Sequence, residues 1–87
     1  MEEQQLFDAV RKRLEDRLDP SVSRHNELVI SFEADPREGR AIEVERMKHL
    51  LKARIDGASE TLSILANELG IDYQPKQYSI YEYNPRK

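Results

Sequence analysis

The chain lacks cysteine and tryptophan and contains few glycine, proline or aromatic residues. Without cysteine it can form no disulfide and offers no thiolate to a metal ion. No apolar run approaches the roughly 18 residues that suggest a membrane-spanning helix, and the opening MEEQQLFDAV is acidic, unlike a basic signal peptide. We therefore expect a cytoplasmic protein with no membrane segment.

Acidic residues outnumber basic ones, 17 to 14, and the net charge of -3 counts against attraction of the whole surface to DNA or RNA. The 87 residues are expected to form one domain, near the size at which a single core only just stabilises a fold. A charged share of 36% beside an apolar share of 38% indicates exposed helical faces. So small a core favours a dimer, in which a second copy completes the burial.

Hydrophobic periodicity predicts an α+β fold in the order helix, strand, long helix, strand. Residues 2–18 have apolar side chains at helical spacing, and Pro20 disfavours helical geometry at the residue before it, so we expect the first helix to end there. Residues 26–34, NELVISFEA, alternate as a half-buried strand does. Residues 77–83, QYSIYEY, have the β-branched and aromatic content of a second strand, and residues 84–87 are expected to be a flexible tail.

The longest helical pattern covers residues 40–69 and has Gly57 near its middle. Its apolar residues keep one phase across the glycine, within a stripe roughly 80° wide, which favours a continuous helix. In the alternative, Asp56 caps a second helix and residues 57–59 form a tight corner. Gly70 is suited to end the last turn in the left-handed conformation.

A helix of thirty residues is roughly 45 Å long, and a first helix of about 25 Å would cover only part of its apolar stripe. We therefore expect a second copy to cover the rest. Residues 46–54 contain four basic residues and no acidic one, and residues 56–72 contain four acidic residues and no basic one, so an antiparallel pair places opposite charges side by side. The predicted homodimer interface comprises Val44, Met47, Leu51, Ile55, Gly57, Ala58, Leu62, Leu65 and Leu69. In the alternative, the chain is a monomer whose first helix covers the stripe.

No group of residues is typical of catalysis or metal binding. His25 and His49 are the only histidines, and neither has a second histidine three or four residues away. Ser21, Ser23 and His25 alternate near acidic residues, but no nucleophile elbow or glycine-rich phosphate loop accompanies them. The sequence therefore predicts a non-enzymatic protein with no catalytic residue, no cofactor and no metal site.

Nucleic-acid binding is the alternative function. Residues 65–72, LANELGID, resemble the middle of a helix-turn-helix, but Pro75 falls within the recognition helix that would follow. In a winged-helix order the recognition helix would be residues 58–69, which contain acidic residues and no basic one. Tyrosines of the last strand, with basic residues beside them, could instead stack on the bases of a single strand.

The remaining pattern favours a small homodimeric adaptor, regulator or inhibitor that acts by binding another protein. The last predicted strand is expected at a sheet edge, and such edges recruit further strands. Tyrosines are common interface anchors, so the predicted partner-binding residues are Lys76, Tyr78, Tyr81 and Tyr83. The expected partners are a second copy of the chain and an unidentified protein.

Overall fold

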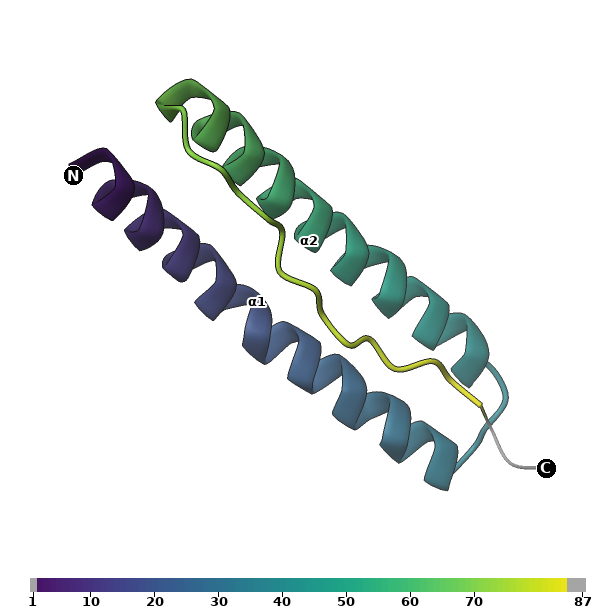
Figure 1. The fold of residues 1–87 in the computed structure, drawn as a ribbon. Helices are drawn as coiled ribbons and strands as arrows, with labels where there is room; N and C mark the ends of the chain where they lie inside the picture. Colours follow the sequence, from purple (N-terminus) through teal and green to yellow (C-terminus); the bar gives the residue numbers. More distant parts are fainter. Residues whose placement is uncertain (1, 85–87) are drawn as a thin grey trace.

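The computed structural model describes residues 2–84, in which two long antiparallel helices form a hairpin (Figure 1). α1 spans Glu2–Ala34 and α2 spans Arg40–Leu69. Residues 71–84, here called the tail, form neither helix nor strand and run back from the end of α2 along both helices (Figure 1). The result is a rod with extents of 55 × 16 × 14 Å.

The predicted α+β class is wrong, because residues 2–84 contain no strand and the fold is a helical hairpin. Residues 26–34, predicted as a strand, belong to α1. His25, Val29 and Phe32 are buried there at steps of four and three residues, which is helical spacing. Short apolar runs fit both periods, and burial of this stripe against α2 decides between them.

α1 also passes through Pro20, where the sequence predicted its end. Proline cannot donate the backbone hydrogen bond to the carbonyl of Asp16, four residues earlier. Both residues are exposed, so water can reach this side of the helix and satisfy the carbonyl. Leu18 and Val22, on either side of the proline, are buried. Their packing outweighs the helix penalty of proline, which is about 3 kcal/mol.

α2 is continuous through Gly57, as the phase of its apolar residues predicted. Gly70 ends the helix in the left-handed conformation with φ 68°. The N–H groups of Gly70 and Ile71 donate to the carbonyl oxygens of Asn67 (3.3 Å) and Ala66 (2.8 Å). This is the Schellman pattern of hydrogen bonds, and it confirms the predicted C-cap. The cap also turns the chain back along the hairpin.

The core is a row of side chains between the helices, with an aromatic residue of the tail packed on each end. At the free end of the hairpin, Phe7 is buried with Leu62 and Ala66, and Tyr73 meets the Phe7 ring edge-on at 5.7 Å. At the loop end the buried residues are Val29, Phe32 and Val44, and Tyr83 packs against them. The tail therefore completes both ends of the core.

The predicted dimer interface lies mostly inside this single chain. Val44, Leu51 and Leu62 are buried, Met47, Ile55, Ala58, Leu65 and Leu69 are half-buried, and Gly57 is exposed. α1, at 33 residues, is long enough to cover the stripe of α2 along its whole length. The premise that one copy cannot cover the stripe therefore does not hold. In this fold a homodimer requires a different surface.

Candidate functional site

The hairpin has two opposite sides, and the tail occupies one of them. On α1, Asp19 and Asn26 contact the tail, whereas Arg17 and Arg24 line a groove that contains no tail residue. At 100° per residue these two pairs lie about 160° apart around the helix. We call the first side the tail groove and the second side the open groove.

Asn26 holds the tail through its backbone. Its Nδ2 donates to the carbonyl oxygen of Ser79 at 2.9 Å, and its Oδ1 accepts from the N–H of Tyr81 at 2.9 Å. These two hydrogen bonds involve the backbone carbonyl of Ser79 and the backbone N–H of Tyr81, two residues later. A neighbouring β-strand would bond to the same two groups. One helical side chain thus takes the place of the sheet that the sequence predicted for residues 77–83.

The amide of Asn26 in turn fixes the tautomer of His25. Its Oδ1, identified by the bond from Tyr81, can only accept, so Nδ1 of His25, which lies 3.1 Å from this oxygen, carries the hydrogen. Its Nε2 is buried and has no hydrogen-bond partner within residues 2–84. His25 is 4% exposed and also lines the open groove. It therefore connects the open groove with the contact that holds the tail.

Charged side chains hold the tail on both sides of Asn26. Lys76 Nζ lies 2.8 Å from Asp19 Oδ1, and this hydrogen bond raises the pKa of Lys76. Toward the loop end, Lys48 Nζ lies 3.5 Å from a carboxylate oxygen of Glu82. These contacts join the tail to α1 and α2 respectively, so it is tied to both helices.

The four predicted partner-binding residues all lie on the tail, which packs along the helices of the same chain. Lys76 pairs with α1, and its Nζ lies 5.1 Å from the centre of the Tyr78 ring. Tyr78 is half-buried, its hydroxyl has no hydrogen-bond partner within the described chain, and burial raises the pKa of Tyr78. Tyr83 packs on the core, and Tyr81 is 45% exposed. Their binding of a partner stays a prediction.

The open groove consists of two hollows that share Ser21 and Arg54 and measure about 410 and 520 Å³. Both volumes fall in the range of roughly 300–1,000 Å³ that is usual for binding sites. The apolar residues that line the groove are Leu14, Leu18, Leu28, Met47, Leu50, Leu51, Ala53, Gly57 and Ala58. The groove therefore offers a mainly apolar surface along much of the hairpin.

The charge of the open groove is entirely basic. Arg17, Arg24 and Arg54 line it, and no aspartate or glutamate does. None of these arginines forms a salt bridge with another residue between positions 2 and 84. Guanidinium groups bind carboxylates through paired hydrogen bonds. In a protein of net charge -3, this groove is therefore a local concentration of positive charge.

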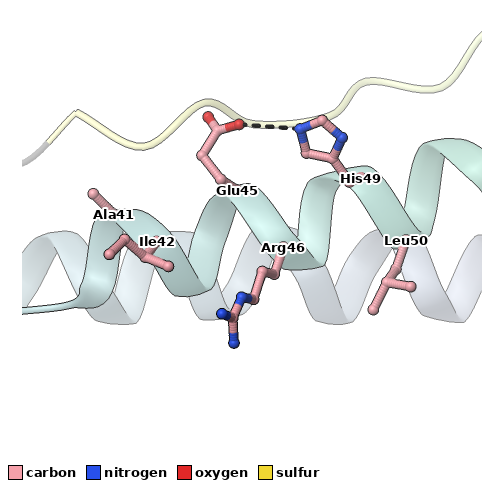
Figure 2. A pocket seen from close by; sticks show the side chains of 6 residues that line it. All are labelled: Ala41, Ile42, Glu45, Arg46, His49 and Leu50. Atoms are coloured by element: carbon pink, nitrogen blue, oxygen red, sulfur yellow. Dashed lines mark ion pairs between the residues drawn. The ribbon is translucent and has the colours of Figure 1, made fainter.

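A third surface is the outer face of α2, which adjoins the open groove and shares Leu50 with it. Figure 2 shows Ile42, Arg46 and Leu50 on the side of α2 away from the tail, with Glu45 and His49 nearer to it. Glu45 and His49 lie 3.5 Å apart and form an ion pair when the histidine is protonated. This contact joins two exposed residues one helical turn apart, so it does not cover Ile42 or Leu50.

No protein-family model, curated protein or solved structure matches this chain. Within residues 2–84, no group of three histidine, aspartate or glutamate side chains is placed to hold a metal ion. Neither helix of this region is apolar enough over the necessary length to cross a membrane. The open groove and the outer face of α2 therefore remain as the candidate sites.

Sequence reasoning missed both Asn26 and the arginines of the open groove. It placed Asn26 at the start of a strand, where a bond to the tail could not be foreseen. Arg17 and Arg24 are seven residues apart, with Ser21 between them, so they share one helical face. That signal becomes visible only when α1 is extended through Pro20.

Proposed function

We propose that the chain is a non-enzymatic protein-binding module, of the adaptor, regulator or inhibitor kind, that holds an acidic amphipathic helix in its open groove. The observation that carries this proposal is the combination of an apolar floor with three arginines and no carboxylate. An amphipathic helix fits such a surface, because its apolar face packs into the groove while its flanks stay polar.

The partner's charge follows from the arginines. Carboxylates on both flanks of the bound helix would meet Arg17 and Arg24 on α1 and Arg54 on α2. Charges at the edge of an interface mainly raise the association rate and select the partner, whereas the apolar floor supplies most of the affinity. Binding is therefore expected to weaken as salt is added, but not to disappear.

Nucleic acid is the rival ligand, because arginines also bind phosphate. The positions of the aromatic residues favour a protein partner. Stacking on bases needs exposed aromatic rings beside basic groups. The three tyrosines predicted to bind a partner lie on the tail, on the opposite side of the hairpin from Arg17 and Arg24.

The test uses the full chain and a fluorescent synthetic helical peptide of about 20 residues, with leucines on one face and glutamates on both flanks. A second peptide carries lysine in place of every glutamate. Fluorescence anisotropy should show binding of the acidic peptide and little binding of the basic one. The double variant Arg24→Glu with Arg54→Glu should lose at least about tenfold in affinity for the acidic peptide and gain affinity for the basic one.

Lys52→Glu is the matched control, because Lys52 is an exposed residue of α2 that lines neither hollow of the open groove. The control should bind the acidic peptide nearly as well as the original chain. An equal loss in the control and in the arginine variants would refute specific binding in the groove. Tighter, arginine-dependent binding of a labelled oligonucleotide would favour the nucleic-acid alternative.

A further inference from the structure

Gly57 weakens α2, and no contact within residues 2–84 requires a glycine at this position. It has ordinary helical geometry, since positive φ angles occur only at Gly39 and Gly70 among the described residues. A Cβ atom built on Gly57 would meet nothing within 4 Å. Glycine is the poorest helix former after proline, so alanine would be the better residue for an isolated hairpin. A close approach by another chain is a physical use for the empty space beside Gly57.

The outer face of α2 carries large apolar side chains on both sides of a region of small residues. Ile42, Leu50 and Ile64 are 61%, 69% and 59% exposed, and Ala53 and Gly57 lie between the two isoleucines. At 100° per residue, these five positions fall within a stripe about 80° wide. Single exposed apolar residues are ordinary, but three on one face of one helix indicate an interaction surface.

The face is symmetric about Ala53 in a way that suits two antiparallel copies. Ile42 precedes Ala53 by eleven residues and Ile64 follows it by eleven. Arg46 precedes it by seven, and Glu60 follows it by seven. In an antiparallel pair that crosses at Ala53, each isoleucine therefore meets the other isoleucine of the second copy, and each Arg46 meets a Glu60. Neither Arg46 nor Glu60 forms a salt bridge within residues 2–84.

We propose that the outer face of α2 binds a second copy of this chain in an antiparallel homodimer whose twofold axis passes Ala53. Leu50 of each copy then packs over Gly57 of the other, and the missing side chain provides the room that it needs. The orientation follows from the charges of this face, because an antiparallel pair brings each Arg46 to a Glu60 of the other copy. A parallel pair would place like charges together.

Light scattering and sedimentation on the full chain, without peptide, from about 5 to 500 µM test this proposal. One helical face per copy makes a small interface, so we expect the mass to rise from one copy to two with a dissociation constant of about 1–100 µM. A constant monomer mass up to the highest concentration would overturn the proposal. Peptide is left out because Leu50, Ala53 and Gly57 also line the open groove, where a bound helix would compete with the second copy. Because the readout is the mass of the chain alone, failure here is distinct from failure of peptide binding.

Gly57→Ala separates the proposed role from a structural one. If the space beside Gly57 receives Leu50 of a second copy, alanine should raise the dissociation constant of the dimer at least about fivefold through overpacking. The same change should raise the unfolding midpoint of the dilute monomer by about 4–8 °C, because it strengthens the helix. A higher midpoint with unchanged dimerisation would show that Gly57 is not at the contact.

Charge reversal tests the register. Arg46→Glu and Glu60→Arg should each weaken the dimer by about threefold or more, because each creates two like-charge pairs across the axis. The double variant restores both pairs and should dimerise nearly as well as the original chain. Ala53→Glu should prevent dimerisation, whereas Ser63→Glu, which adds the same charge elsewhere on exposed α2, should not. No rescue in the double variant, or an equal effect of the two glutamates, would refute this arrangement.

Discussion

Replacing Asn26 by alanine should release the middle of the tail while leaving the helices intact. The change removes the two hydrogen bonds of 2.9 Å that hold the tail, one to Ser79 and one from Tyr81, and it also removes the acceptor of His25 Nδ1. A typical intramolecular hydrogen bond contributes about 0.5–1.5 kcal/mol net, so the docking of the tail should weaken by about 1–3 kcal/mol. Water can reach the released groups because Ser79 and Tyr81 are exposed, which favours the lower half of this range.

Amide hydrogen exchange measures this effect at the affected atom. A loss of about 1.4 kcal/mol corresponds to tenfold faster exchange of the Tyr81 N–H when the tail opens locally. Alanine is the better helix former by up to about 0.7 kcal/mol, but it leaves the buried His25 without its hydrogen-bond partner, so α1 should unfold at the same temperature or slightly below it. Amides in the middle of α2, such as that of Leu51, should exchange at an unchanged rate.

Asn26→Asp is the control that separates the two bonds. A carboxylate keeps an acceptor for the Tyr81 N–H but cannot donate to the carbonyl of Ser79. Tyr81 should therefore stay more protected in this variant than in the alanine variant. The reasoning is refuted if the Tyr81 amide exchanges at the same rate with asparagine and with alanine. It is equally refuted if α2 loses protection to the same extent as the tail, because the effect would then be global.

Two further substitutions test how much Pro20 and the buried hydroxyl of Tyr78 cost in stability. Pro20→Ala should raise the free energy of unfolding, measured in urea, by about 1–2 kcal/mol, because it restores a backbone hydrogen-bond donor inside α1. A decrease would show that the surrounding structure depends on the proline ring. Tyr78→Phe should leave stability at pH 7 unchanged or raise it by up to about 1 kcal/mol, since the hydroxyl that it removes is buried without a partner. Burial raises the pKa of Tyr78 above its ordinary value of 10.0, so the folded state holds the phenolic proton more tightly and stability falls as the pH rises past that value. Tyr78→Phe should reduce this fall, and Lys76, whose pKa is also raised, should account for the part that remains. Thermal unfolding at pH 7 to 11 measures the effect. An equal decrease of stability with pH in both proteins would contradict this assignment.

The α2 region was predicted well because its signals are local. The helical phase across Gly57 depends on the spacing of residues within one element, and the Gly70 cap depends on the conformational freedom of a single residue. Neither requires knowledge of what packs against the helix. The positions of Arg46 and Glu60, each seven residues from Ala53, are likewise a property of the sequence, and they support the dimer register proposed for the outer face.

The strand predictions failed where local signals conflict or where a partner is needed. Residues 26–34 fit an alternating and a helical pattern at once, and contact with α2 selected the helical one. Residues 77–83 have the composition of a strand, but a strand needs a neighbour to bond with. In this fold the neighbour is the side chain of Asn26, which no rule of strand pairing would identify.

The sequence by itself determined the absence of disulfides, the extent of α2 and the distribution of charge along it, because each depends on residue identity or short-range spacing. Only the tertiary structure decided that α1 continues through Pro20, that the tail lies along both helices, and that Arg17, Arg24 and Arg54 line one groove. These features depend on contacts between residues far apart in the chain. The free energy of these contacts exceeds the helix or strand preference of any single segment. The sequence of one segment alone therefore cannot predict them.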